Sequence, residues 1–270
     1  MQKNRVIKYI SFVISILLIV SCSEYEKVLK SNDAEYKFRK AMEYYNTADY
    51  ERASSIFEQI VNVYRGTTRG DTVHYYFAKS YYGQDDYIMA GHYFKELTEI
   101  YSRSPFAEES EYLVGYCYYK MSPRPSLDQE NTNEAIQSFQ RFMYKYPGSK
   151  YLPETQRMIT ELNNKLVEKA YLNAKLYFKL GYYKASIIAL RNCLTQYPET
   201  KYREELMFLI LKSNYLLAEN SVPGKRKERY QSTLDEYYGF ISEFPESQYK
   251  KETEKIYNST KEILKLQVDN

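Results

Sequence analysis

Apolar residues recur along most of this chain with the spacing of one face of an α-helix. Positions i, i+3, i+7, i+10 and i+14 share one side of a helix that turns once in about 3.6 residues. Five segments follow this spacing, each with a small or hydroxyl-bearing residue second and an aromatic residue last; they begin at Tyr50, Tyr87, Thr132, Tyr183 and Tyr230. The pattern predicts five amphipathic helices, each burying one such stripe.

A second helix is predicted before each of these five. Its pattern is a large residue, a small residue three positions later, and an aromatic residue or leucine four positions after that. The triplets are Phe38, Ala41 and Tyr45; Tyr75, Ala78 and Tyr82; Tyr112, Gly115 and Tyr119; Tyr171, Ala174 and Phe178; and Ile210, Ser213 and Leu217. Because a small residue lets two helices approach closely, the pattern predicts five successive helix pairs.

Similar turns are predicted after the second helix of several pairs. Residues 146–151, 197–202 and 244–249 each have proline after a first aromatic residue and Ser or Thr two positions later. Proline cannot continue a helix, and the hydroxyl can cap the next one. Ser104-Pro105 is expected to be a variant, with serine as the cap and proline first in the helix. Residues 65–68 replace the motif after the first pair.

The repeat length indicates lengthened tetratricopeptide (TPR) units. Successive second helices begin 37, 45, 51 and 47 residues apart, against about 34 for a standard TPR. A single pair cannot bury its apolar face, so neighbours must stack. We therefore expect an all-α fold, a TPR-like α-solenoid of about five helix pairs over residues 33–268, with longer turns at 121–131 and around 220–228. The expected units are about 33–66, 71–105, 106–148, 150–199 and 201–268.

The start of the chain has the pattern of a bacterial export signal. Residues 1–8 are basic, and residues 10–20 form an apolar run interrupted only by two serines. As a helix this run would span about 16 Å, roughly half of the bilayer hydrocarbon. It therefore suits the core of a signal peptide over residues 1–21 better than a transmembrane helix.

Residues 19–22, Ile-Val-Ser-Cys, resemble a lipobox. We therefore expect cleavage before Cys22, acylation of its thiol and amine, and a lipidated tether over residues 22–32. Several acyl chains anchor a protein firmly, whereas one chain does not. Ser23 after the cysteine favours the outer membrane by analogy with lipoprotein sorting, while Glu24 and Glu26 leave export to the cell surface open.

Composition and motifs argue against nucleic-acid binding and against catalysis. Without Lys3, Arg5 and Lys8 of the signal peptide, Lys+Arg falls from 38 to 35 and equals Asp+Glu, whereas phosphate binding needs a basic surplus. The chain has no HExxH, GxSxG, Walker A or GxGxxG motif. We expect no enzyme and no cofactor apart from the covalent lipid. His74 and His92 are expected to pack or face water, and Cys117 and Cys193 to be buried thiols.

These features together resemble the BamD family of outer membrane lipoproteins. The residues that carry the resemblance are the lipobox, the segment 22–30, the turns of the Tyr-Pro-x-Ser-x-Tyr kind, and the long turn with Ser122-Pro123 and Leu127-Asp128-Gln129. The resemblance implies a scaffold of the β-barrel assembly machinery, lipid-anchored in the cell outer membrane and facing the periplasm. The partners it implies are a BamA-like barrel subunit, unfolded outer-membrane proteins and the membrane, with no nucleic acid.

The resemblance also implies which repeats bind which partner. The C-terminal repeats would hold the barrel subunit, and the N-terminal repeats would receive C-terminal segments of unfolded outer-membrane proteins. A tyrosine-lined groove suits an extended peptide, although core packing is the plainer interpretation of these aromatic residues. The candidate groove residues are Tyr36, Arg39, Tyr44, Tyr76 and Lys79. The candidate docking residues are Lys225, Arg226, Lys227 and Arg229 in the long turn of the fifth pair, together with the last helix.

Two other functions are compatible with a TPR lipoprotein. One is a glycan-binding partner of a glycan-uptake transporter; such proteins are usually much longer and carry large non-helical inserts. The other is an adaptor for peptidoglycan or cell-division machinery; such adaptors often have an N-terminal coiled coil. The sequence has no sustained heptads after Cys22 and therefore lacks the sign of such a coiled coil. Both functions are kept as alternatives to the assembly role.

Overall fold

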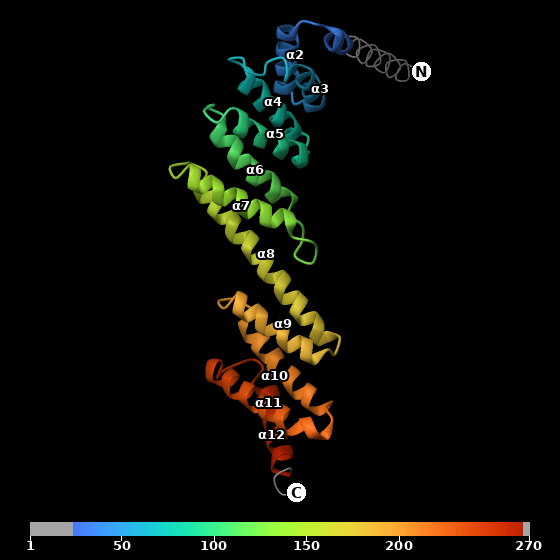
Figure 1. The fold of residues 1–270 in the computed structure, drawn as a ribbon, viewed down its shortest axis with the longest axis vertical. Helices are drawn as coiled ribbons and strands as arrows, with labels where there is room; N and C mark the ends of the chain where they lie inside the picture. Colours follow the sequence, from blue (N-terminus) through green and yellow to red (C-terminus); the bar gives the residue numbers. More distant parts are fainter. Residues whose placement is uncertain (1–23, 267–270) are drawn as a thin grey trace, which may run out of the picture. The chain divides into compact units, whose positions relative to one another are not determined.

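The computed structural model describes residues 24–266, and the predictions for the signal peptide and for Cys22 lie outside this range. The described residues form helices joined by turns, without a strand (Figure 1). The helices are α2 (Ala34–Asn46), α3 (Tyr50–Ile60), α4 (Gly70–Gly83), α5 (Tyr87–Ile100), α6 (Ala107–Met121), α7 (Glu130–Lys145), α8 (Leu152–Lys179), α9 (Tyr183–Gln196), α10 (Arg203–Glu219), α11 (Pro223–Glu243) and α12 (Lys250–Leu266). The all-α prediction is confirmed.

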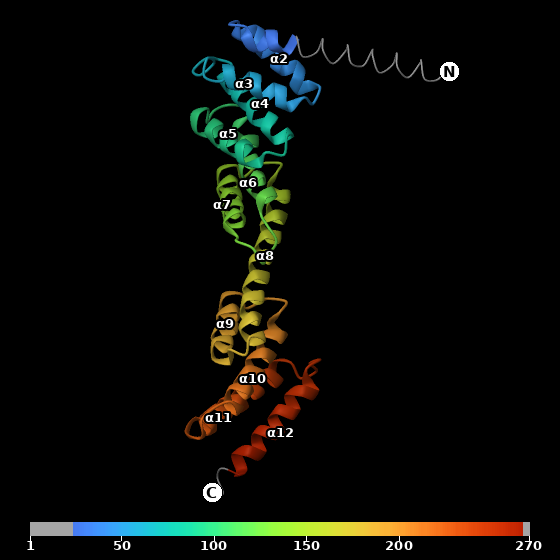
Figure 2. The same cartoon turned by 90° about the vertical axis from the view of Figure 1, so that its right-hand side faces the viewer.

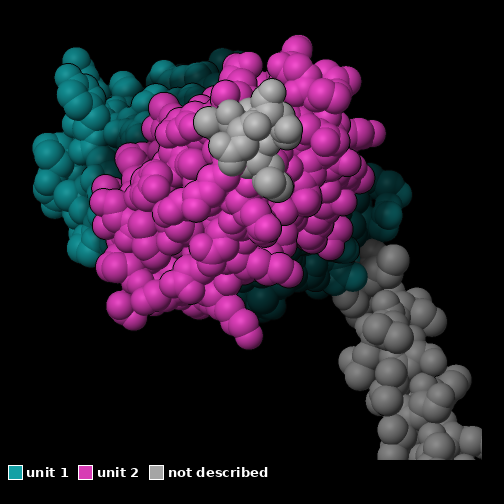
Figure 3. Space-filling model, turned by 90° about the horizontal axis from the view of Figure 1, so that it is seen from below, with its two compact units in different colours: residues 1–123, 129–162 teal, residues 124–128, 163–270 magenta. Residues whose placement is uncertain are grey.

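The described chain divides into two compact units. Unit 1 holds residues up to 123 and 129–162, and unit 2 holds residues 124–128 and those from 163 onward (Figures 2 and 3). The division falls within α8, a helix of 28 residues. In unit 1 each helix from α2 to α7 packs against the next, and in unit 2 the same holds from α9 to α12.

The packing stripes predicted from the sequence form the cores of the repeats. The second position of each stripe has no exposed surface in any of the five helices; these residues are Ala53, Ala90, Ala135, Ser186 and Thr233. α3, α5 and α9 begin at the predicted residues, Tyr50, Tyr87 and Tyr183. A stripe of this kind is buried because its small residue allows the paired helix to approach while the large residues fill the space beside it.

One predicted turn is present and the other is not. Between α6 and α7 the chain is non-helical from residue 122 to residue 129, as expected. In the fifth pair the predicted loop around 220–228 is wrong, because α11 already begins at Pro223. Val222 is extended and Pro223 occupies the first turn, where its fixed φ and missing N–H favour a helix start. The basic residues from Lys225 to Arg229 therefore lie on a helix.

The five turns between helix pairs share one hydrogen-bond pattern. A Ser or Thr hydroxyl accepts a hydrogen bond from the backbone N–H two residues later, at 2.9–3.3 Å; these residues are Thr67, Ser104, Ser149, Thr200 and Ser247. The hydroxyl thus holds the turn instead of capping the helix. Pro105 is not the first residue of α6, whose N-cap is Phe106. The divergent residues 65–68 make the same turn, with Gly66 at a φ of +80°.

The segment predicted to be a tether is packed against unit 1. Residues 24–30 form a short helix. Val28 has no exposed surface and belongs to the same core cluster as Ala41, Ile56 and Phe57. The fold of unit 1 therefore includes most of residues 22–32.

Candidate functional site

A stacked pair of aromatic rings joins the first helices of neighbouring repeats. One ring lies on the first helix of a pair, and the other ends the turn that leads to the next first helix. The stacks, each given with the distance between its ring centroids, are Tyr75 on Phe106 (4.3 Å), Tyr112 on Tyr151 (4.3 Å), Tyr171 on Tyr202 (4.0 Å) and Phe208 on Tyr249 (4.1 Å). Their ring planes lie within 15° of parallel. At the first junction the Arg69 guanidinium lies 5.7 Å from the Phe38 ring instead. We call these contacts the junctions.

Three of the junctions also contain a lysine–glutamate pair. The lysine follows the first ring by four residues and the glutamate follows the second ring by three, as Lys79–Glu109 (3.5 Å), Lys175–Glu205 (2.6 Å) and Lys212–Glu252 (2.6 Å). Hydrogen bonds from Lys175 to Glu205 and to the Tyr171 hydroxyl raise the lysine pKa. These lysines also lie over the first ring, 5.1 Å from its centroid in the case of Lys175. At such a junction the lysine and glutamate charges neutralise each other, and both side chains are already ion-paired.

The third junction lacks this ion pair. Tyr116 stands where the second, fourth and fifth junctions have lysine, four residues after Tyr112. Its ring lies 6.0 Å from Tyr112, 6.1 Å from Tyr82 and 5.8 Å from Tyr119. Tyr87 adds a further ring, 5.7 Å from Tyr82. We call these five residues, which come from α4, α5 and α6 of unit 1, the tyrosine cluster.

Four tyrosines of the cluster have a raised hydroxyl pKa and so remain protonated at neutral pH: Tyr82, Tyr87, Tyr112 and Tyr119. Burial is the main cause that raises the pKa of Tyr82 and of Tyr112. A hydrogen bond to Asp85 raises the pKa of Tyr87 to about 12. The Tyr119 hydroxyl donates to Glu161 at 2.9 Å. The cluster therefore offers ring faces and neutral hydroxyls, which suit contacts with a peptide and its backbone.

The predicted groove residues occupy three different surroundings. Tyr44 meets the Tyr25 ring at 5.8 Å, so the segment 24–30 lies against it. On the same helix, Arg39 is exposed and its guanidinium lies 6.0 Å from the Tyr36 ring.

The other two groove residues lie at the second junction. Tyr76 packs edge-on against Tyr45 at 5.0 Å, and Lys79 pairs with Glu109. The structure therefore does not gather the five predicted residues into one site. It gathers Tyr82, Tyr87, Tyr112, Tyr116 and Tyr119. The sequence pattern had marked all of these except Tyr116, and only as packing residues.

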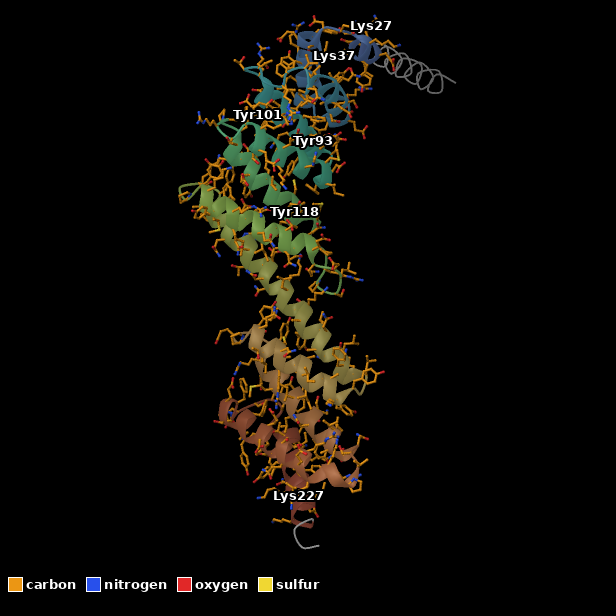
Figure 4. The ribbon with its side chains drawn as sticks, in the orientation of Figure 1. Lys27, Lys37, Tyr93, Tyr101, Tyr118 and Lys227 are labelled. Atoms are coloured by element: carbon orange, nitrogen blue, oxygen red, sulfur yellow. The ribbon has the colours of Figure 1, made fainter. Side chains whose placement is uncertain are left out.

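Two of the predicted docking residues, Arg226 and Arg229, make hydrogen bonds within the fold, although Arg226 is exposed like Lys225 and Lys227. Arg226 donates to the backbone carbonyls of Ser221 (2.8 Å) and Glu219 (3.3 Å). Arg229 donates to the Ser221 hydroxyl. Carbonyls at the end of a helix lack intrahelical partners, so both arginines complete the end of α10. Lys225 and Lys227 are exposed on α11, where Figure 4 marks Lys227.

Unit 2 also exposes a set of large apolar side chains that the sequence stripes do not include. Their exposed fractions are Leu172 39%, Leu176 52%, Leu180 56%, Tyr182 62% and Ile188 55%. We call these residues of α8, the following turn and α9 the apolar patch. A hollow of about 700 Å³ adjoins it, lined by Tyr182, Ile188 and Leu217 among others. Leu172 and Leu176 lie four residues apart on one face of α8, and Tyr182 and Ile188 line one hollow. Large exposed apolar patches mark interaction sites in soluble proteins.

The edge of the apolar patch is basic. Lys179 and Lys184 are exposed, and neither has an ion pair within the described residues. The signal in the sequence is the leucine spacing i, i+4, i+8 at Leu172, Leu176 and Leu180, which falls beside the packing stripe that starts at Tyr171. This spacing predicts an apolar helix face, but not whether another helix covers it.

The described residues hold no cluster of metal-binding side chains, and their two cysteines are buried. Within residues 24–266, no group of three or more His, Cys, Asp or Glu residues is placed to hold a metal ion. No helix in that range is long and apolar enough to cross a membrane. Cys117 and Cys193 are buried free thiols, and burial raises the pKa of Cys117 to about 12. His74 is buried with its Nε2 3.2 Å from a Glu96 carboxylate oxygen.

Comparison with known proteins adds a relationship that runs through both units. Residues 30–229 match the family described as YfiO, outer membrane lipoprotein. A protein of Aquifex aeolicus (strain VF5), assigned as outer membrane protein assembly factor BamD, is 30% identical over 246 residues, which cover 90% of this chain and 80% of the relative. The outer membrane protein assembly factor BamD of Caulobacter vibrioides is 23% identical over 109 residues, 40% of this chain and 36% of that protein.

Among solved structures, the TPR2AB-domain:pHSP90-complex of yeast Sti1 aligns with a TM-score of 0.38 and 13% identity, over 84% of this chain and 98% of that one.

Proposed function

The chain belongs to the YfiO family of outer membrane lipoproteins, the family of the BamD assembly factors, and on this premise we propose that it is a scaffold subunit of the machinery that assembles β-barrel proteins in the outer membrane. The observation that carries the proposal is the match of this family to residues 30–229. A scaffold needs binding surfaces and no reactive centre, and the two surfaces described above are of that kind.

We assign the apolar patch of unit 2 to the barrel subunit, a BamA-like protein. Exposed leucine and tyrosine side chains such as Leu180 and Tyr182 bury area on docking and can form the centre of an interface. The exposed Lys179 and Lys184 at its edge favour a partner surface with carboxylates around an apolar centre. This assignment replaces the docking role predicted for Arg226 and Arg229, which are engaged within the fold.

We assign the tyrosine cluster of unit 1 to segments of unfolded outer-membrane proteins. Strands of membrane β-barrels alternate apolar and polar residues and carry aromatic residues near their ends. Tyr82 and Tyr116 can stack on such aromatic side chains, and protonated hydroxyls can donate to the peptide backbone. At this junction a neutral tyrosine replaces the lysine that the neighbouring junctions pair with glutamate, while Glu154 keeps the position of the glutamate.

The remaining parts of the proposal concern the anchor and the compartment. Acylation of Cys22 would tether the mature chain to the outer membrane with its repeats in the periplasm, and no catalytic group or cofactor is involved. The acylated cysteine follows from the lipobox at residues 19–22 and agrees with the lipoprotein family.

The partner of the protein can be identified directly. A C-terminally tagged chain is purified from detergent-solubilised membranes, and the co-purifying proteins are determined by mass spectrometry. The expected result is a roughly stoichiometric β-barrel protein with repeated periplasmic domains. Recovery of a glycan-uptake transporter or of cell-wall enzymes, without that barrel, would contradict the assembly role.

A further inference from the structure

Several contacts hold the N-terminal segment 24–30 against unit 1, and we call them the clamp. Val28 is fully buried in the core of the unit. The Tyr25 ring meets Tyr44 edge-on, and the Arg52 guanidinium lies 5.4 Å from the Tyr25 ring. These contacts come from α2 and α3, so the segment is held by both helices of the first pair.

An ion pair holds the very start of the described chain. Lys40 Nζ lies 2.9 Å from the Glu24 carboxylate and 2.7 Å from Glu43. The hydrogen bond to Lys40 lowers the pKa of Glu24. The clamp therefore begins at Glu24, the first residue that the structure describes.

The residues that link this segment to α2 are held by hydrogen bonds. Ser31 N–H donates to the Val28 carbonyl at 3.1 Å, and Asp33 N–H donates to the Ser31 hydroxyl at 3.1 Å. The Asp33 carboxylate then accepts from the N–H groups of Glu35 and Tyr36, both at 3.0 Å, and caps the helix. From Glu24 onward the chain is thus continuous with the folded unit.

We propose that unit 1 is seated directly on the membrane surface, with the segment 24–30 as its contact with the lipid headgroups. This inference rests on the proposed acylation of Cys22. One residue separates Cys22 from Glu24, so their Cα atoms are at most about 8 Å apart. The headgroup region of one leaflet is roughly 5–8 Å thick. A free tether over residues 22–32 could instead extend to about 36 Å.

The outer side of the segment suits lipid phosphates. Lys27 and Lys30 are both exposed, while Val28 points into the core. Lys30 is 3.2 Å from Glu26, and Lys27 has no ion pair within the described residues. Figure 4 shows Lys27 at the N-terminal end of unit 1. Glu24 and Glu26 of the segment are ion-paired with Lys40 and Lys30, so Lys27 is the charge left to attract an anionic headgroup.

The test uses the full lipidated chain in vesicles of phosphatidylethanolamine and phosphatidylglycerol that contain a lipid with a nitroxide on its headgroup. A fluorophore is placed on Lys27→Cys; the native Cys117 and Cys193 are 0% and 3% exposed and stay unlabelled. Quenching is compared with a chain carrying about twenty Gly/Ser residues between Ser23 and Glu24. That insertion adds a mean span of about 25 Å and leaves the clamp intact. We expect strong quenching that the insertion reduces several-fold.

A second variant addresses the clamp itself. Val28→Asp places a charge in the core and should release the segment, reducing quenching of a fluorophore on Lys37→Cys. Val63→Asp is the matched control, because Val63 is 63% exposed in the same unit, and it should change nothing. Circular dichroism confirms that unit 1 stays folded in each variant, and the insertion chain tests the idea even where Val28→Asp unfolds.

The outcomes separate the two hypotheses. Equal quenching with and without the insertion, in vesicle-bound protein, would overturn the seating of unit 1 on the headgroups. Mass spectrometry of the mature N-terminus tests the anchor independently, because an unacylated Cys22 would remove the premise and not the clamp.

Discussion

Units 1 and 2 are built from the same repeat but leave different residues at the surface. In unit 1 the tyrosine cluster gathers five rings, of which that of Tyr112 is buried and the other four are half-buried, and the large exposed apolar residues include Val63 and Ile88. In unit 2 the junctions at Tyr171 and Phe208 keep their lysine–glutamate pairs, while an apolar patch remains exposed along α8 and α9. The comparison teaches that ring stacking uses the same positions at four of the five junctions, so we expect the functional difference between the units to come mainly from the residues beside the stacks.

The largest expected effect separates the cores of the two units. Phe139 is fully buried in unit 1, and a Cβ added to Gly115 would lie only 2.5 Å from its ring. Phe139→Ala should cost about 3–5 kcal/mol of unfolding free energy, and Leu190→Ala in unit 2 about 2–5 kcal/mol. Hydrogen exchange should then accelerate mainly in residues 24–162 for the first variant and in residues 163–266 for the second. Uniform acceleration in both would mean that the units unfold as one.

A smaller effect is expected from exchanging the junction residues. Tyr116→Lys gives the third junction the lysine of its neighbours, with Glu154 three residues after Tyr151 as its carboxylate. The variant should stay folded but bind peptides from the last strand of a barrel protein at least tenfold more weakly, a loss of about 1.4 kcal/mol. Lys175→Tyr in unit 2 is the reciprocal control and should leave peptide affinity unchanged. Fluorescence anisotropy measures both, and unchanged binding by Tyr116→Lys would remove the peptide site from the cluster.

The smallest effect is a pH dependence confined to unit 1. Burial lowers the pKa of His74, although Glu96 opposes the shift and Arg65 and His92 support it. A histidine whose folded pKa is lowered stabilises the fold above its unfolded pKa of about 6.5 and loses that contribution as the pH falls below it. Unit 1 should therefore lose stability between neutral pH and pH 5, and His74→Phe should lessen the loss. Thermal unfolding of both chains across this pH range measures the loss of stability. An equal dependence of the unfolding temperature on pH in the two chains would show that His74 is not responsible.

The repeat spacing in the sequence was enough to predict which residues form the cores of the repeats. Ala53 and Ala90 were expected in the core because a small residue recurs at the same place in every stripe, and both are fully buried. In the fifth pair the stacked ring is Phe208, not Ile210, because Phe208 is the residue that meets Tyr249 at the end of the following turn. Spacing within one helix does not reveal that relation.

Other features depend on contacts that no local pattern contains. Arg226 and Arg229 form a basic cluster in the sequence, yet the end of α10 takes up both guanidinium groups. Leu176 and Leu180 have the spacing of a buried face, and only the arrangement of the neighbouring helices leaves them exposed. The packing of Val28 was missed for the same reason, because one valine in a short charged segment carries no periodic signal.

The central claim is that unit 2 docks the barrel subunit through its apolar patch. It is tested by measuring the affinity of purified chain for the periplasmic domains of that subunit, comparing Leu176→Asp with Leu180→Asp and with Ile88→Asp, a change at a residue of unit 1 that is 70% exposed. Because all three sites are on the surface, unfolding free energies should change by less than about 0.5 kcal/mol. The account predicts that either leucine variant weakens binding by more than about 2 kcal/mol, roughly thirtyfold, and that Ile88→Asp binds as the unaltered chain does. Full affinity in both leucine variants would contradict the claim.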